Sequence, residues 1–252
     1  RFIPKGCIYV LEIVYEKEIP DKIEIESKRI ISIDLGVNNF ATITNNIGEQ
    51  SIIINGRGIK SINQFYNKRR AKIQSILKKI NNKDWSNKLD KITLKRNNRI
   101  KNFMHHASKF IIDYCIKNNI DTIVIGKNDR WKQESVLNDK VNQNFIGIPY
   151  ELFIQMMGYK GEDNNIKVIE NTESYTSGTS FIDNELPIKG NYDKSRRIVR
   201  GLFKSNYGIL INSDVNGSLQ IMRKVFPDAI EYSYGIEGSL TPIAMNVVKL
   251  AA

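Results

Sequence analysis

Three short apolar segments stand close together near the start of the chain and constrain its fold more than any other feature. They occupy residues 29–34, 39–44 and 51–54, are rich in Ile and Thr, and are separated by turn sequences of Asn and Gly. Segments of this length and composition are typical of β-strands. Three of them within about 25 residues predict an antiparallel meander, because only tight turns fit between them. An earlier apolar segment, residues 7–15, predicts one more strand.

After the meander the hydrophobic period changes from that of a strand to that of a helix. Apolar spacing and turn residues then predict six further elements in this order: a helix at 62–80, a helix at 100–115, a strand at 121–125, a helix after Pro149, a strand at 167–169 and a helix at 213–225. Antiparallel strands followed by helices and further strands predict an α/β protein, with a mixed sheet and helices on its faces. The ribonuclease-H-like fold has this order, and several other α/β folds share it.

The composition narrows the class of protein. The 252 residues are 41% hydrophobic and 26% charged, which is ordinary for one large globular domain or a domain with a satellite. No apolar run approaches the ~18–20 residues that span a bilayer, and we expect no signal peptide. With only Cys7 and Cys115, the chain holds neither a four-thiolate zinc site nor a disulfide framework. We therefore expect an intracellular protein with no membrane partner. Because it begins at Arg1 in what resembles mid-domain sequence, we also expect it to be incomplete at its N-terminus.

The positive charge is concentrated in one segment. The chain has a net charge of +11, and residues 57–101 hold 15 Lys and Arg against only Asp84 and Asp90, a net charge of +13. A basic stripe on helices is typical of proteins that bind a polyanion, because each neutralised phosphate releases counterions. The alternative is a solvated, Lys-rich helical face of the kind that AT-rich genomes encode. We favour nucleic acid as the partner.

Two aspartates stand at the ends of separate predicted elements. Asp34 ends the apolar strand 29–34 just before Gly36, and Asp214 lies at the start of the last helix. Alone, the first could be a turn residue and the second a helix N-cap. Together beside a basic stripe, they suggest an acidic site, in which carboxylates raise one another's pKa unless a divalent cation neutralises them. Oxygen ligands without Cys or His suit Mg²⁺, with Mn²⁺ as the alternative, and a pair of such ions can support phosphodiester cleavage.

Five ordered motifs resemble those of the TnpB family, the transposon-encoded probable transposases with a RuvC domain. They are residues 33–44 and 212–221, which resemble the first and third RuvC motifs, and residues 63–68, 123–128 with 131–133, and 173–177. The resemblance covers about residues 5–228. It implies a ribonuclease-H-like (RuvC) fold and an RNA-guided DNA endonuclease related to type V CRISPR effectors, with guide RNA and target DNA as partners. Two alternatives stay open: a nuclease-inactive, repressor-like RNA-guided DNA-binding protein, and a ribonuclease-H-type transposase that acts in DNA transposition.

The resemblance also implies a division of the chain and a place in the cell. The expected parts are the end of a wedge β-barrel domain (1–28), the first part of the RuvC nuclease domain with basic helices at 59–118 (29–175), an insert in place of a zinc ribbon (176–208), the final RuvC helix (209–228) and a tail (229–252). A bacterial or phage-encoded, cytoplasmic, nucleoid-associated protein is the expected setting. The sequence leaves the oligomeric state open.

One departure from the family concerns the second acidic motif. The family usually has a glutamate at the exit of the strand after the second long helix, but Gly126 stands there and has no side chain to bind metal. The next strand exits toward Glu173, the first residue of the Glu-Ser-Tyr-Thr-Ser motif (173–177), so we expect Glu173 to complete a catalytic, metal-binding set with Asp34 and Asp214. Glu170 is the alternative, and Glu134 is a weaker one.

A second departure concerns the insert at 176–208. It contains no Cys and no His, so we expect no structural zinc there and expect packing alone to hold it. The apolar residues available for that packing are Phe181, Ile182, Leu186, Ile198 and Phe203.

Basic residues of the stripe and of the insert are the expected contacts to nucleic acid. The candidates are Lys68, Arg69, Arg70, Lys72, Arg96, Arg99 and Arg200. The adjacent pair Arg196-Arg197 could contact phosphates in the same way or lie on a solvated loop. Sequence would then be read by base pairing to the guide rather than by these side chains.

Overall fold

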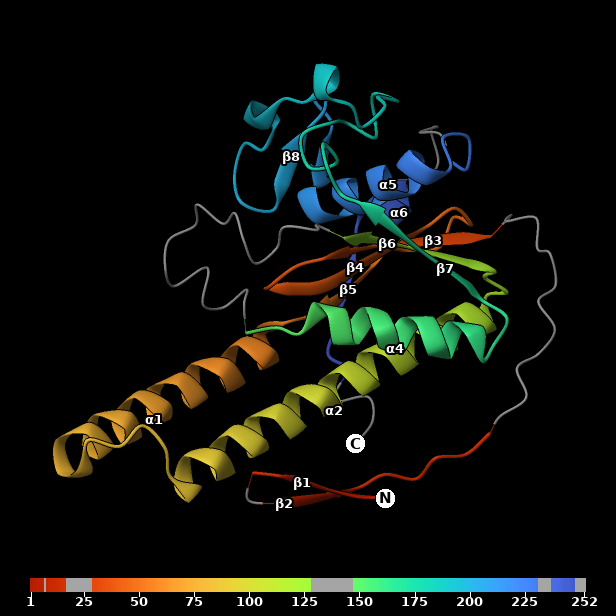
Figure 1. The fold of residues 1–252 in the computed structure, drawn as a ribbon. Coiled ribbons are helices and arrows are strands. Elements are labelled where there is room, and N and C mark those ends of the chain that lie inside the picture. The colour runs from red at the N-terminus through yellow and green to blue at the C-terminus, as the bar shows by residue number, and fades with distance from the viewer. Residues whose placement is uncertain (7, 17–28, 128–146, 231–236, 248–252) are drawn as a thin grey trace.

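The structure, a computed structural model, describes residues 1–6, 8–16, 29–127, 147–230 and 237–247 (Figure 1). The strands are β1 (Phe2–Lys5), β2 (Ile8–Leu11), β3 (Ile30–Leu35), β4 (Asn39–Asn45), β5 (Ile52–Asn55), β6 (Thr122–Lys127), β7 (Lys167–Thr172), β8 (Leu202–Lys204), β9 (Leu210–Asn212) and β10 (Ile243–Met245). The helices are α1 (Arg57–Asn81), α2 (Asn87–Lys117), α4 (Tyr150–Glu162), α5 (Ser213–Val225) and α6 (Glu237–Leu240), with short 3₁₀ turns at Lys189–Asn191 and Lys194–Arg196. Glu134 and the motif residues 131–133 lie outside the described residues.

A six-stranded mixed sheet forms the centre of the molecule, in the order β10-β5-β4-β3-β6-β7. The pairs β3–β4 and β4–β5 are antiparallel, which confirms the predicted meander, whereas β6 and β7 continue parallel to β3. Helices α2 and α4 lie on one side of the sheet and α5 on the other (Figure 1). The predicted mixed sheet with helices on its faces is confirmed. In the described part of the chain, no helix combines the length and apolar character that crossing a bilayer would need.

The alternation of side chains along β3 assigns residues to the two faces. Ile31 and Ile33 are fully buried in the main core, together with residues of α2 and α4. Ile30 instead packs with Ile221 of α5 in a smaller cluster on the opposite face. Because strand side chains alternate between faces, Asp34 belongs to the α5 face.

Small residues bring α5 unusually close to the sheet. Ser32 Oγ donates to the Ser218 carbonyl oxygen at 2.6 Å and lies 2.7 Å from Thr44 Oγ1. Ser218 Oγ in turn lies 3.0 Å from the Ser32 carbonyl oxygen and 3.1 Å from that of Thr42. All of these side chains are buried, and their mutual hydrogen bonds satisfy groups that would otherwise be costly to desolvate. At this point α5 and the sheet are therefore in contact through small polar side chains and backbone carbonyl groups, not through large apolar side chains.

Gly126 takes part in the same close packing. The register of β3 and β6 pairs Ile33 with Ile125, so Gly126 lies beside Asp34. A Cβ atom at position 126 would lie only 2.4 Å from Ile221 Cδ1 of α5. The absence of a side chain at this position thus has a packing reason, and Ile221 fills the space that a side chain would need.

The segment from 176 to 208 packs around a core of its own. Phe181, Ile182 and Phe203 are buried in a cluster with Ile211, Val215, Leu219 and Leu240. This confirms three of the five residues expected to hold the segment; Leu186 and Ile198 are 49% and 48% exposed.

The prediction that packing alone holds this segment is wrong, because buried polar side chains of α5 also bind it. Asn216 Oδ1 accepts from the Phe181 N–H at 2.9 Å, and Asn216 Nδ2 donates to the Thr179 carbonyl oxygen at 2.8 Å. Arg223 Nη1 donates to the Phe181 carbonyl oxygen at 3.0 Å, with its guanidinium 4.4 Å from the Phe181 ring centre. Hydrogen bonds to buried backbone groups thus help to attach this segment to α5.

Several element boundaries differ from the predicted ones, each for a physical reason. The strand expected over 7–15 ends at Leu11 and pairs with β1 in a separate two-stranded sheet. Helix α2 begins at Asn87, not near residue 100, because Ser86 Oγ caps it by accepting from the Leu89 N–H at 3.2 Å. Its N-terminal half extends beyond the sheet with α1 (Figure 1), so the apolar spacing marks only the half that packs on the core. The strands β8, β9 and β10 are too short to have been predicted.

We expect Phe40→Ala to lower the free energy of unfolding by about 3–5 kcal/mol, because it deletes a large ring from a close-packed core. Phe40 is fully buried, with ring centres of Phe153 and Phe103 at 4.9 and 5.1 Å and that of Tyr150 at 6.2 Å. The matched control, Phe65→Ala, removes a ring that is 57% exposed and should cost below about 1 kcal/mol. Urea denaturation followed by circular dichroism measures both; equal losses would contradict the assigned core.

We expect Gly126→Ala to destabilise the protein by about 1–3 kcal/mol, because the new methyl group overpacks the contact with Ile221. Combining it with Ile221→Ala should cost less than the sum of the two single changes, since the second substitution opens the space that the first one needs. Denaturation of the wild type, both single variants and the double variant completes the cycle. Additive losses would show that the two positions do not compete for space.

Candidate active site

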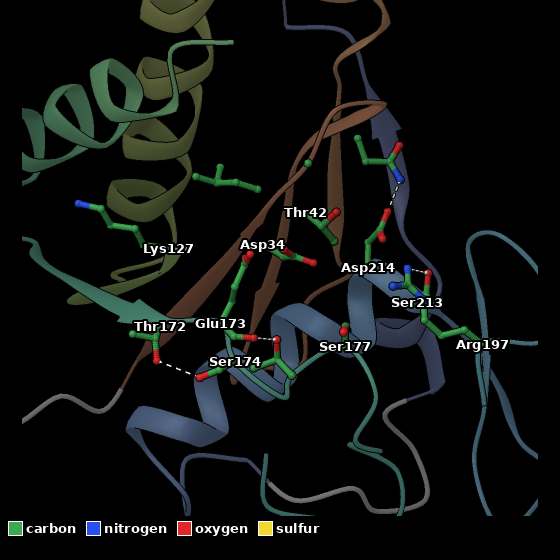
Figure 2. A pocket seen from close by; sticks show the side chains of 14 residues that line it. Asp34, Thr42, Lys127, Thr172, Glu173, Ser174, Ser177, Arg197, Ser213 and Asp214 are labelled. Atoms are coloured by element: carbon green, nitrogen blue, oxygen red, sulfur yellow. Dashed lines mark hydrogen bonds between the residues drawn. The ribbon is translucent and has the colours of Figure 1, made fainter. Parts of the chain in front are cut away.

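A polar pocket lies where the ends of β3, β7 and α5 meet. Its volume is about 490 Å³, and Asp34, Glu173 and Asp214 are all among its lining residues (Figure 2). The three carboxylates come from positions 34, 173 and 214 of the chain, so only the fold brings them together. The rest of the lining is rich in hydroxyl and amide groups, including Asn39, Thr42, Ser174, Thr176, Ser177 and Ser213.

Asp34 is held where β3 runs beneath α5. It pairs with Thr42 in the antiparallel register, and its side chain is on the α5 face. A Cβ atom on Gly217 of α5 would lie 2.9 Å from Asp34 Oδ2. A β-carbon this close to an oxygen atom would displace it. Because residue 217 is glycine, the Asp34 carboxylate can occupy this space.

Glu173 and Glu170 lie on opposite faces of the sheet. Glu173 directly follows β7, and its N–H donates to the Lys127 carbonyl oxygen at 3.2 Å, which continues the β6–β7 ladder by one residue. Glu170 points toward α4, where it binds Lys127 Nζ at 2.8 Å; the same ammonium binds Glu151 at 3.1 Å. Glu170 and Glu173 are three positions apart in an extended segment, and residues an odd number of positions apart along a strand point to opposite faces. Of the two expected alternatives, only Glu173 lines the pocket.

Asp214 lies in the first turn of α5 but does not cap the helix. The N-cap is Asn212, whose Oδ1 accepts from the N–H groups of Asp214 and Val215 at 2.9 and 3.2 Å. Asp214 Oδ2 instead accepts from Asn39 Nδ2 at 2.7 Å. Asn39 stands at an irregularity in the β4–β5 register, and such bulges re-aim side chains.

The pocket strongly disfavours negative charge on Asp34. Burial raises the pKa of Asp34 well above its usual value of 3.8, and the nearby carboxylates of Glu173 and Asp214 raise it further, whereas Arg197 acts in the opposite direction. Three carboxylates face only two cationic side chains among the lining residues, Arg197 and Lys127, so the pocket has an excess of negative charge. A bound cation would relieve that repulsion.

The pocket fits a divalent cation by the chemistry of its donors. Carboxylate oxygens with no thiolate or imidazole are the ligands that Mg²⁺ and Mn²⁺ prefer. Thr42 Oγ1 is buried at the same place and has no hydrogen-bond partner among the described residues, so the pocket wall also offers an unused hydroxyl. Among the described residues, no group of three or more Asp, Glu, His or Cys side chains lies close enough together to hold a metal ion. The three carboxylates thus line one pocket without forming a tight cluster.

Most of the other lining residues were not predicted as part of the site, among them Asn39, Thr42 and Arg197. Arg197 was noted only with its neighbour Arg196, and the structure separates the two. Arg196 Nη1 binds Glu185 Oε2 at 2.6 Å within the 176–208 segment, whereas Arg197 lines the pocket and its Nη2 donates to Ser213 Oγ at 3.3 Å. Adjacent arginines look alike in sequence, and only their partners distinguish them.

The predicted nucleic-acid contacts have different surroundings. The exposed side chains among them are Lys68, Arg69, Arg70 and Lys72 on α1, Arg99 on α2, and Arg200. Arg96 is engaged within the protein instead: its Nε donates to Asn63 Oδ1 at 2.8 Å and its Nη2 to the Gly147 carbonyl oxygen at 2.5 Å. Its guanidinium joins α1, α2 and the segment before α4, so we leave Arg96 out of the nucleic-acid surface.

Comparisons with known proteins agree with this fold and arrangement. The model of the probable transposase family OrfB_IS605 matches residues 12–132, and the model of the Cas12f1-like TNB domain matches residues 150–221. No curated protein matches the chain.

Two solved structures resemble the chain at the level of the fold. The "Cryo-EM structure of the Cas12f1-sgRNA-target DNA complex" aligns with a TM-score of 0.57 and 19% identity over 79% of this chain and 51% of that one. The "Cryo-EM structure of CRISPR-Cas12f Ternary Complex" aligns with a TM-score of 0.53 and 19% identity over 81% and 40%. This chain thus spans about half or less of those proteins. The likeness confirms the predicted ribonuclease-H-like (RuvC) fold. The two family models match in succession along the sequence, so the chain is similar to the TnpB-like probable transposases over residues 12–132 and to the Cas12f1-like TNB domain over residues 150–221.

Proposed function

We propose that the chain is the catalytic part of an RNA-guided, Mg²⁺-dependent DNA endonuclease of the TnpB type, which hydrolyses phosphodiester bonds. The observation that carries the proposal is the pocket into which Asp34, Glu173 and Asp214 converge from three separate elements. The relatives with this fold are titled as complexes with sgRNA and target DNA or as a ternary complex, which supports nucleic acid as the substrate.

The three carboxylates would hold Mg²⁺, or Mn²⁺ in its place. When bound, such ions activate the attacking water and stabilise the departing 3′-oxygen. Asp34 would be the central ligand, because the negative charges of both other acids act on it. Asn39 fixes Asp214 by donating to its Oδ2 at 2.7 Å, which leaves Oδ1 to face the pocket.

Other lining groups suit a phosphodiester substrate. The Arg197 guanidinium, held by Ser213 Oγ at 3.3 Å, brings positive charge to the wall of the pocket and can bind a non-bridging phosphate oxygen. The buried Thr42 hydroxyl, which has no partner among the described residues, can donate to an oxygen of the substrate or of an ordered water. These groups orient the substrate and neutralise its charge.

The basic helices would track nucleic-acid backbone at a distance from the pocket. α1 and α2 project from the sheet as a long hairpin (Figure 1), and α1 carries Lys68, Arg69, Arg70 and Lys72 on exposed positions. Such contacts are independent of sequence, so base pairing between a guide RNA and the target DNA would supply specificity. In this proposal residues 1–28 end a wedge domain, 176–208 form a module that carries Arg197 and Arg200, and residues 229–252 form the tail.

We expect Asp34→Asn, Glu173→Gln and Asp214→Asn each to reduce the rate of DNA cleavage by at least about 100-fold, because each removes a charged ligand from the site. The assay uses the protein with its cognate RNA and a DNA target in Mg²⁺, and EDTA should abolish cleavage. Glu170→Gln is the matched control and should cleave normally, since Glu170 lies on the opposite face of the sheet.

The same assay separates the alternatives. Equal DNA binding by the wild type and Asp34→Asn, with cleavage by neither, would replace the endonuclease by a nuclease-inactive RNA-guided DNA-binding protein. Transposition in the absence of RNA would instead favour a ribonuclease-H-type transposase. Normal cleavage by Glu173→Gln would overturn the assignment of the third carboxylate.

We expect Asp34→Asn to raise the melting temperature of the metal-free protein at neutral pH. A raised pKa in the folded state gives stability that is fully present below the ordinary value of 3.8 and is lost as pH rises toward the folded pKa. The asparagine variant does not suffer this loss, so its advantage should grow with rising pH. Mg²⁺ should then stabilise the wild type selectively. Thermal melts from pH 4 to 8 measure the effect, with the exposed Asp113→Asn as a control; an advantage independent of pH would contradict it.

A further inference from the structure

Glu173 occupies a structurally weak position for a metal ligand. It follows β7, which is an edge strand of the sheet among the described residues, so within that part of the chain the backbone ladder supports Glu173 from one side. The Glu173 carboxylate also lies near Asp34, and the negative charge of Glu173 raises the pKa of Asp34. A residue under such repulsion at a strand end needs further contacts if its carboxylate is to stay in the pocket.

Lys224 of α5 supplies contacts on both sides of Glu173. Its Nζ lies 2.9 Å from the Thr172 carbonyl oxygen and 2.9 Å from Thr172 Oγ1. The same atom lies 3.2 Å from the Ser174 carbonyl oxygen and 2.9 Å from Ser174 Oγ. These four oxygens are neutral and belong to the residues directly before and after Glu173. An ammonium group has three protons, so it can serve several such acceptors at once.

A simpler explanation for Lys224 is a favourable place at the C-terminal end of a helix, where cations interact with the helix dipole. That explanation predicts an ammonium directed at the last carbonyl groups of α5 itself or at solvent. The ammonium of Lys224 instead contacts another segment, some 50 residues earlier in the chain. The dipole therefore does not account for where the ammonium lies.

The turn after Glu173 is held from the other direction as well. Thr176 Oγ1 donates to the Glu173 carbonyl oxygen at 2.7 Å. Tyr175 has a φ of 68°, a left-handed conformation that is unfavourable for a bulky residue and persists only where the surroundings enforce it. The chain thus turns sharply just after Glu173, and the ammonium of Lys224 fixes the residues on which that turn begins.

We propose that Lys224 is a positioning residue that anchors the segment 172–174 to α5 and so aims the Glu173 carboxylate into the pocket. The inference rests on the proposed function, because it takes Glu173 as a ligand of the divalent cation. Since α5 carries Asp214 in its first turn and Lys224 in its last, one helix places one acid directly and a second acid through its lysine. Such an anchor is needed when the third acid stands beyond an edge strand instead of within the inner strand β6, where Gly126 leaves no side chain.

The test is the affinity of the full chain for Mn²⁺, measured by electron paramagnetic resonance without nucleic acid. We expect Lys224→Met to weaken Mn²⁺ binding by about 10-fold, as removal of groups that orient metal ligands typically does. Lys204→Met, which removes the same charge from an exposed position of β8, is the matched control and should bind as the wild type does.

A second comparison shows whether Lys224 acts through Glu173. In a Glu173→Gln background, Lys224→Met should weaken Mn²⁺ binding no further, because the ligand that the lysine aims is already gone. An equal loss in both backgrounds, or wild-type affinity in Lys224→Met, would overturn the inference.

If Lys224→Met does not fold, the double variant Thr172→Val and Ser174→Ala removes the two hydroxyl partners and keeps the charge of Lys224. Unchanged Mn²⁺ affinity in that double variant would equally overturn the inference. Wild-type affinity in Glu173→Gln would instead refute the proposed role of Glu173 as a metal ligand.

Discussion

The close contact between α5 and the strands β3 and β4 is the constraint on which the rest of the structure depends. Ser218 shares hydrogen bonds with Ser32 and Thr44 across this contact, and Gly217 leaves the space in which the Asp34 carboxylate lies. The same helix binds the 176–208 segment through Asn216 and Arg223. Sheet, helix and inserted segment therefore form one unit, and the acidic pocket lies where all three meet.

Much of this site could be predicted because its residues leave local signals. Asp34 follows an apolar strand, and Asp214 begins an amphipathic helix, so both lie where elements end. Glu173 could be proposed because Gly126 left a gap that a neighbouring strand could fill. The choice between Glu173 and Glu170 needed the pairing of β7 with β6, because that pairing decides which of them faces α5.

Other residues could not be placed from the sequence because their roles depend on partners far away in the chain. Arg96 carries the same charge as its exposed neighbours, yet it binds Asn63 and the carbonyl oxygen of Gly147. Arg197 and Lys224 differ from nearby basic residues only in what lies opposite them. Hydrophobic periodicity likewise did not predict the N-terminal half of α2, because the part of a helix that lies beyond the core does not need an apolar stripe.

The contact between Gly126 and Ile221 has a consequence for how sequences of this kind can change. A glutamate at position 126 would collide with Ile221, which now occupies that space. Replacing Ile221 alone by a smaller residue would leave a cavity between α5 and the sheet. Neither step is neutral without the other. A sequence with the acid on the inner strand β6 and a sequence with the acid beyond the edge strand β7 would thus be separated by coupled substitutions, because a single change gives an intermediate that is either overpacked or hollow.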